Sequence, residues 1–127
     1  MKNENENIHL TDGNVNISEN VIANIAKIAA EEIDGVNKIT KSVTATITDI
    51  FSKQPNMGVK VETNNNEVII DLSVELVYGV NISEVASKVQ LNVKSSIETM
   101  TGLMVKEVNV LVSGLFIKKN PLEENKA

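Results

Sequence analysis

The sequence predicts an α+β protein, a two-layer sandwich in which two main amphipathic helices cover one face of a mixed, roughly five-stranded sheet. Apolar residues recur at three- and four-residue spacing near residues 18–33 and 82–100, which is typical of helices. Between these stretches, from Gly58 to Val77, the apolar residues alternate with a period of two, which is typical of strands. Each apolar stripe has to be buried against another element, and a shared sheet face does this for both helices.

The first expected element is a short strand through Val15 and Ile17. Ser18 then caps a helix that has Glu19 in its positive first turn and runs to about Ile33. The apolar stripe of this helix consists of Val21, Ile25, Ile28 and Ala29, widened by Ile22, Ala26 and Ile33. Asp34-Gly35 ends the helix, and a short strand from Val36 to Ile39 follows.

A hairpin is expected from Gly58 onward, because Val59 and Val61 alternate before the asparagine-rich turn at residues 63–66. On its second arm one face is expected to be core and the other mostly wet. The core face carries Val68, Ile70, Leu72, Val74 and Leu76, and the wet face carries Ile69, Asp71, Ser73, Glu75 and Val77.

The second helix opens at Asn81, three residues ahead of Glu84, and ends at Gly102. Its stripe is Ile82, Val85, Ala86, Val89, Val93, Ile97 and Met100. The final strand places Met104, Val108, Val110 and Val112 on one face, with Leu111, Leu115 and Phe116 nearby.

The length of 127 residues and a hydrophobic content of 42% suit one modest core. We expect a disordered N-terminal tail at residues 1–12, one domain at residues 13–117 and a flexible C-terminal tail at residues 118–127. No apolar stretch is long enough to cross a bilayer, and the polar N-terminus lacks the features of a secretory signal. A cytoplasmic protein is expected, and the absence of cysteine is compatible with that location.

Charge and aromatic content argue against nucleic acid as a partner. The net charge is −5, all 12 basic residues are lysine, and the only aromatic residues are Phe51, Tyr78 and Phe116. Phosphate recognition favours positive fields and arginine forks, and single-stranded nucleic acids favour aromatic stacking.

No residue pattern indicates an enzyme. The single histidine, His9, lies in the polar N-terminal tail, and the serine and threonine residues have no histidine to activate them. Asp71 and Glu75 share the wet face of one strand, where paired carboxylates are usually solvating charges. The prediction is that there are no catalytic residues.

No metal or cofactor is predicted either. The acidic group Glu31, Glu32 and Asp34 lacks the ligand spacing of a calcium loop, and its carboxylates are expected to contact lysines on neighbouring elements. The glycines that end or bend elements are isolated, so no phosphate-binding loop is present.

Residues 41–54 form the segment whose role the sequence leaves open. Val43, Ile47, Ile50 and Phe51 recur there at helical spacing. This face either packs on its own domain, forms an interaction surface for a partner or a second copy, or lies on a membrane surface. The small number of apolar anchors disfavours binding to a bare bilayer.

Several ordered segments resemble the alkaline shock protein family, the Gls-type envelope stress response or general stress proteins. The opening resemblance lies in residues 17–22 and 32–36, and the later one in residues 58–61, 68–77 and 78–82. The helix carrying Val85, Val89 and Gln90, and the passage from Met100 through Gly114, continue the same order. The resemblance covers roughly residues 15–117.

This resemblance implies a non-enzymatic scaffold or interaction protein of cell-envelope homeostasis and the general, or alkaline, stress response. It implies a homo-oligomer near the inner face of the membrane, placed there by a membrane-anchoring protein partner. As an alternative, it implies a regulator that binds an enzyme or ligand of fatty-acid or lipid metabolism. It carries over no catalytic residue.

Direct membrane insertion is not expected. Compared with longer, basic-tailed family members, this chain has short acidic tails in which Lys118-Lys119 is the only paired basic element. Recruitment by anionic lipid needs several basic residues, each contributing about 1 kcal/mol. Association through a protein adaptor is therefore the expectation.

Overall fold

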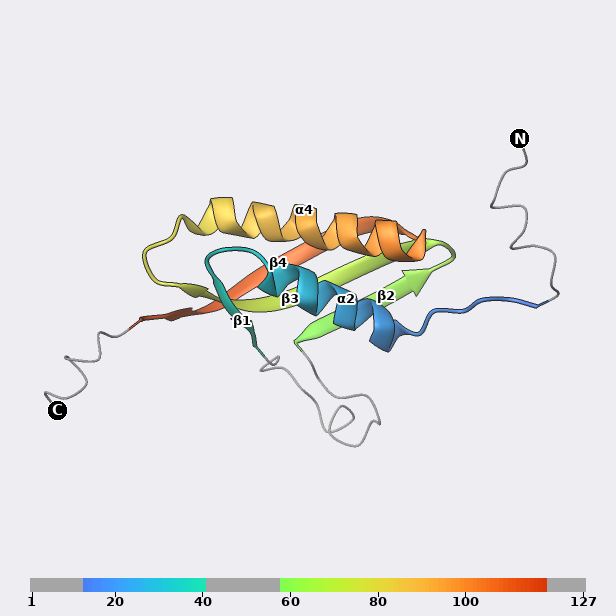
Figure 1. The fold of residues 1–127 in the computed structure, drawn as a ribbon, viewed down its shortest axis with the longest axis horizontal. Helices are drawn as coiled ribbons and strands as arrows, with labels where there is room; N and C mark the ends of the chain where they lie inside the picture. Colours follow the sequence, from blue (N-terminus) through green and yellow to red (C-terminus); the bar gives the residue numbers. More distant parts are fainter. Residues whose placement is uncertain (1–12, 41–57, 119–127) are drawn as a thin grey trace, which may run out of the picture.

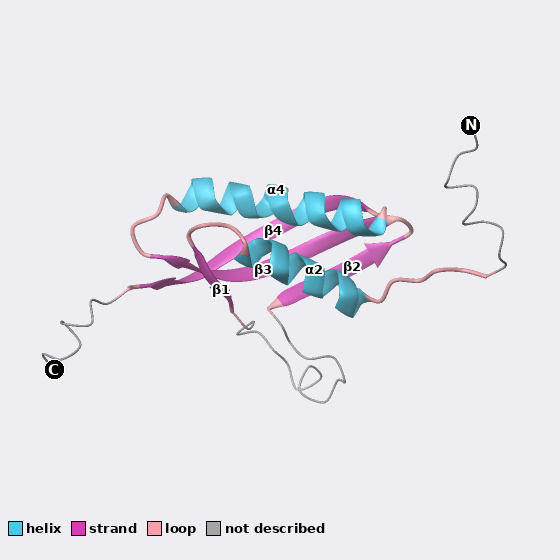
Figure 2. Cartoon of the chain, viewed as in Figure 1, coloured by secondary structure: helices cyan, strands magenta, loops and turns pink. Residues whose placement is uncertain are grey.

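The computed structural model describes residues 13–40 and 58–118, which form six helices and strands (Figure 1). In chain order these are α2 (Glu19–Glu31), β1 (Val36–Ile39), β2 (Val59–Asn64), β3 (Glu67–Val77), α4 (Ile82–Thr101) and β4 (Met104–Phe116). Both helices lie over the same face of one sheet (Figure 2). The α+β two-layer fold predicted from the sequence is confirmed, with a sheet of four strands.

The predicted strand through Val15 and Ile17 is wrong. Residues 14–18 have no regular secondary structure, and the Val15 side chain is 88% exposed. Two alternating apolar residues are too few to specify a strand when no neighbouring strand is available to pair with them. The segment instead leads into the Ser18 cap, where the Ser18 hydroxyl accepts a hydrogen bond from the Val21 amide at 3.3 Å.

Helix α2 begins where the sequence predicted, and its buried face is shifted around the helix from the predicted stripe, because Ala23 and Ala30, which the stripe did not include, are buried. Ile22, Ala26 and Ala30 are completely buried, whereas Val21 and Ile28 are 48% and 60% exposed. The helix packs on α4 and on the sheet, and its remaining face lies in solvent. The predicted stripe was therefore wrong at Val21 and Ile28, because a wide run of apolar residues does not show which of them face the core.

Strand β3 is the centre of the sheet, and its predicted core face is confirmed. Alternate residues from Val68 to Leu76 are almost fully buried beneath the helices. The predicted hairpin is also confirmed, because β2 pairs antiparallel with β3 from Val59 opposite Leu72 to Asn64 opposite Glu67. Asn65 in the turn has a φ of 58°, the left-handed conformation expected of an asparagine there.

Strands β1 and β2 lie end to end along the same edge of β3. β1 pairs with the stretch that ends at Val74, and β2 begins opposite Leu72. Between them, the Thr40 amide donates to the Ser73 carbonyl at 2.9 Å, and the Ser73 amide donates to the Gly58 carbonyl at 3.0 Å. The two short strands therefore act as one interrupted edge strand.

Strand β4 runs parallel to β3 and pairs with it from Glu67 opposite Met104 to Val77 opposite Phe116. The register shifts at Lys106 and again at Ser113. The first shift corrects a prediction: Met104 is 57% exposed, and Val105 takes the core position. An extra residue reverses the alternation of side chains, which a strict period of two does not anticipate.

Helix α4 follows its sequence signals closely. The Asn81 side chain accepts a hydrogen bond from the Glu84 amide at 3.0 Å, and Gly102 ends the helix in the left-handed conformation. Val85, Val89, Val93 and Ile97 are buried, while Ile82 and Met100 at the two ends are 44% and 69% exposed. No helix in the described part of the chain is long and apolar enough to span a membrane.

Candidate functional site

The predicted interaction residues Val43, Ile47, Ile50 and Phe51 lie outside the described residues. The structure does show where the residues on either side of this segment lie. Thr40 and Gly58, which flank residues 41–57 in the sequence, both bond to the backbone of Ser73, so these two residues lie side by side at the sheet edge. His9 also lies outside the described residues.

The two carboxylates that the sequence placed on one wet strand face do lie there, and each has its own amide partner. Asp71 accepts a hydrogen bond from the Asn109 side chain at 2.9 Å. Glu75 accepts one from the Asn37 side chain at 2.7 Å. These bonds join β3 to β4 and to β1, so the two carboxylates support the pairing of the strands.

The acidic group near the end of α2 is likewise divided among separate partners. Glu31 forms a 3.2 Å ion pair with Lys27 and accepts a hydrogen bond from the Ile39 amide. Glu32 accepts a 3.1 Å hydrogen bond from the side chain of Asn92 on α4. Within residues 13–40 and 58–118, no group of three or more acidic, histidine or cysteine residues is arranged to hold a metal ion.

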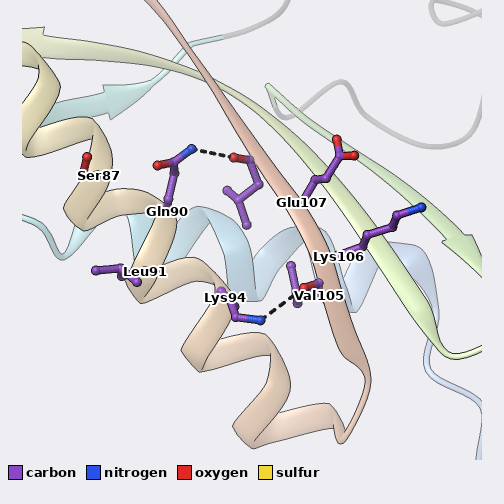
Figure 3. A pocket seen from close by; sticks show the side chains of 8 residues that line it. Ser87, Gln90, Leu91, Lys94, Val105, Lys106 and Glu107 are labelled. Atoms are coloured by element: carbon purple, nitrogen blue, oxygen red, sulfur yellow. Dashed lines mark hydrogen bonds between the residues drawn. The ribbon is translucent and has the colours of Figure 1, made fainter.

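A groove of about 420 Å³ lies between α4 and the start of β4 (Figure 3). Its lining combines an exposed leucine, Leu91, with polar side chains from the helix and the charged pair Lys106 and Glu107 from the strand. The groove therefore has an apolar wall and several hydrogen-bonding groups. It follows the outer edge of β4, the edge that faces away from β3.

Three residues spaced four apart on α4 bond to that edge. Gln90 donates to the Val108 carbonyl at 2.9 Å, and Lys94 donates to the Val105 carbonyl at 3.3 Å (Figure 3). Glu98 accepts from the Val105 amide at 2.9 Å. Residues four apart lie one above another on a helix, so this row covers the first half of the strand edge.

Glu98 also binds Lys94, at 3.0 Å. The Val105 amide, followed by the Lys94 ammonium, holds the pKa of the Glu98 carboxyl below its usual value. A charged carboxylate that accepts two hydrogen bonds is favoured over its protonated form. The start of β4 is thus fixed to α4 by a charged group.

The second half of β4 has a different character. Residues 109–117, which are the second half of β4 and the residue directly after it, contain no charged side chain. Several large apolar side chains are exposed there: Leu111 at 60%, Leu115 at 45%, Phe116 at 41% and Ile117 at 62%. Apolar side chains gathered on one exposed strand are typical of an interaction surface.

The sequence interpretation missed the row formed by Gln90, Lys94 and Glu98. Its signal was available, because three long polar residues at four-residue spacing lie beside the buried stripe of the same helix. The sequence did not show which backbone groups these side chains bind, because the position of β4 alongside α4, with β4 parallel to β3, is a property of the folded chain.

A family model matches residues 7–117; it describes the ASP23 family, with a cell envelope-related function. The uncharacterized protein YqhY of Bacillus subtilis (strain 168) is 34% identical over 116 residues, which cover 91% of this chain and 84% of YqhY. The uncharacterized protein YloU of the same strain is 34% identical over 106 residues, which cover 81% of this chain and 88% of YloU.

Solved structures of MamM CTD variants show a weaker similarity to this structure, with low sequence identity and low TM-scores. A histidine-to-alanine variant has a TM-score of 0.48 at 10% identity, and the copper form of an aspartate-to-histidine variant has a TM-score of 0.48 at 9% identity. Each comparison covers 80% of this chain and 100% of the solved chain. These TM-scores are too low to establish a shared fold.

Proposed function

Since the chain belongs to the ASP23 (alkaline shock protein) family, whose function is related to the cell envelope, we propose that it is a non-enzymatic scaffold or interaction protein of envelope homeostasis. In this role it acts through contacts with further copies of itself and with protein partners, in the general and alkaline stress response. It works on the cytoplasmic side of the membrane, where a partner protein holds it.

The observation that carries the proposal is the surface of β4. Half of its outer edge is covered by side chains of α4, and the other half is uncharged and surrounded by exposed apolar side chains. A strand edge of this kind offers backbone hydrogen bonds and apolar area to another polypeptide. A function through protein contacts uses both.

The carboxylates considered for chemistry support the same conclusion. Asp71 and Glu75 each bond to an asparagine of a neighbouring strand, which is a structural role. Glu98 fixes the start of β4. A protein that contributes surfaces rather than reacting groups needs this kind of rigid sheet.

The proposal is tested by light scattering of the purified full-length chain over a range of concentrations, combined with cross-linking and pull-down from cells. Concentration-dependent assembly, together with recovery of a membrane protein as the cross-linked partner, supports the scaffold. A chain that stays monomeric at every concentration and recovers no envelope protein contradicts it. Specific recovery of an enzyme of lipid metabolism, without self-assembly, replaces the scaffold by a dedicated regulator.

A further inference from the structure

The outer edge of β4 changes character at Val108. Before this point, the Val105 and Val108 backbone groups bond to Glu98, Lys94 and Gln90. Along a strand, the backbone groups of alternate residues point to the same edge, so Val110 and Val112 face outward as Val108 does. One turn before Gln90, the side chains of Ala86 and Ser87 are too short to continue the row.

In residues 13–40 and 58–118, no side chain or strand bonds to the outward-facing backbone groups of Val110 and Val112. β3 occupies the opposite edge of β4 throughout. Unpaired backbone groups on a strand with exposed apolar side chains form a template for a further strand. Natural edge strands usually prevent such pairing with charges or prolines, and residues 109–117 contain neither.

The other edge of the sheet is protected in the usual way. Lys60 and Glu62 of β2 and Lys38 of β1 are exposed there, and the strand is interrupted between β1 and β2. Charged side chains and short strands both discourage edge-to-edge pairing. The second half of β4 lacks both of these protections, so it is the part of the sheet edge that is open to pairing.

We propose that the second half of β4 pairs with the same segment of a second copy, antiparallel and about a two-fold axis at Val112. The inference rests on the self-association in the proposed function and names the surface that carries it. A two-fold interface requires a patch that is complementary to itself. The residues around Val112 meet that requirement in one register.

In this register the extra residue at Ser113 is taken up as a bulge. Val112 lies opposite Val112 of the second copy, and the exposed Leu111 side chain lies over the second copy's Gly114, which has no side chain to obstruct it. Asn109 then lies opposite Phe116. At each end of the paired segment, Glu107 lies opposite Lys118, so a carboxylate meets an ammonium twice in the dimer.

The charges at the two ends of the uncharged segment fit a second copy as the occupant. Each chain has a net charge of −5, so two copies repel each other over most of their surfaces. The uncharged segment removes that repulsion where the strands meet, and the opposed Glu107 and Lys118 add attraction at both ends. A dimer through β4 also extends the sheet continuously from one copy to the other.

The test measures the dimer dissociation constant of the full-length chain by sedimentation equilibrium. Glu107→Lys and Lys118→Glu each place like charges opposite one another and are expected to weaken the dimer about tenfold. The double variant restores opposite charges and is expected to recover most of the wild-type affinity. Leu111→Lys is expected to weaken the dimer at least about tenfold, because it replaces the apolar side chain over Gly114 by a positive charge in each copy, and these like charges lie close together near the two-fold axis.

Ile28→Lys is the matched control, because Ile28 is as exposed as Leu111, at 60%, and lies on α2. It is expected to leave the dissociation constant unchanged. Circular dichroism and urea unfolding of each variant show that the fold is retained. Since the chain has no cysteine, Leu111→Cys also reports the contact through a short bifunctional maleimide. Leu111→Cys should cross-link the copies, and Ile28→Cys should not.

The outcomes separate the two proposals. A wild-type chain that stays monomeric overturns self-association and, with it, the β4 dimer. A chain that assembles normally in all β4 variants and cross-links only at Ile28 overturns the β4 dimer alone. Failure of the double charge reversal to recover affinity, with both single variants weakened, overturns the register centred on Val112.

Discussion

The hydroxyl groups of Thr40 and Ser113 lie 2.7 Å apart, although the residues are 73 positions apart in the chain and belong to opposite sides of β3. Ser113 also donates to the Val74 carbonyl at 3.3 Å. Because a serine hydroxyl has one proton to donate, Thr40 is the donor of the bond between the hydroxyls. This bond holds the edge strand to β4 across β3.

A double-mutant cycle measures this bond. Ser113→Ala and Thr40→Val are each expected to lower the free energy of unfolding by about 0.5–1.5 kcal/mol. The double variant should cost less than the sum of the two, because both substitutions remove the same bond. Urea unfolding checks the prediction, and Ser87→Ala, exposed on α4, serves as a control with an expected effect below about 0.5 kcal/mol.

Glu98 gives a prediction about pH. Its pKa in the folded state is lowered by the Val105 amide and by Lys94, so its charged form contributes stability that is present above the unfolded pKa. That contribution is lost as the pH falls through the lowered, folded-state pKa. Glu98→Gln should therefore be less stable than wild type at neutral pH and equally stable in strong acid.

Urea unfolding of both proteins over a pH series measures this convergence. Glu84→Gln provides the control, because Glu84 also pairs with a lysine four residues away, Lys88, on an exposed face of the same helix. Its difference from wild type is expected to be small at every pH. A Glu98→Gln protein as stable as wild type at neutral pH would show that the carboxylate does not fix β4.

Gly58 and Gly102 make a matched pair for testing close packing. Their φ values are 77° and 76°, so alanine is strained equally at both. A Cβ at Gly58 would overlap the Thr40 carbonyl and lie 2.6 Å from the Ile39 side chain, whereas a Cβ at Gly102 meets nothing within 4 Å. Gly102→Ala should cost about 1–2 kcal/mol of unfolding free energy, and Gly58→Ala should cost at least about 2 kcal/mol more. Equal costs in urea unfolding would contradict the close approach.

Ile97 tests the core. Its side chain is completely buried where α4 packs on the sheet, so Ile97→Ala should lower the free energy of unfolding by about 2–5 kcal/mol through lost burial and a cavity. Met100 is three residues further along the same helix and is 69% exposed. Met100→Ala should change the stability by less than about 0.5 kcal/mol in the same urea titration.

Much of the fold could be predicted because local signals and burial agree. In α4, an asparagine cap, a regular apolar stripe and a terminal glycine all indicate one helix, and the structure confirms it. In β3, alternation over eleven residues leaves one assignment of core and solvent faces. Long periodic elements allow few alternatives.

The predictions that were wrong concern residues whose strand pairing or burial depends on tertiary packing. Val15 and Ile17 alternate as a strand would, but no strand lies beside them to pair with. Met104 was assigned to the core face because nothing in the sequence marks the extra residue at Lys106 that moves Val105 into the core. Val21 and Ile28 are apolar residues whose exposure depends on where α4 meets α2.

The candidate surface was the hardest part to predict. The sequence indicated Val43, Ile47, Ile50 and Phe51, whose role stays a prediction because they lie outside the described residues. The sequence does not show which edge of the sheet is covered, and the β4 edge is identified only from the structure. Its selection depends on three bonds from α4 that cover Val105 and Val108 and stop there. Such bonds are visible only when the elements are placed in space.

The interrupted edge strand has a consequence for how this protein can diversify. Thr40, directly after β1, and Gly58, directly before β2, bond to the backbone of the same residue, Ser73, so the sheet needs only that Thr40 and Gly58 stay in place. Nothing in the pairing sets the length of the segment that joins them. Doubling such a connection adds only about 0.6 kcal/mol of closure entropy. The position is therefore a natural insertion point, where related chains can carry longer or shorter sequences, and where a reporter peptide can be grafted, without changing the register of the sheet.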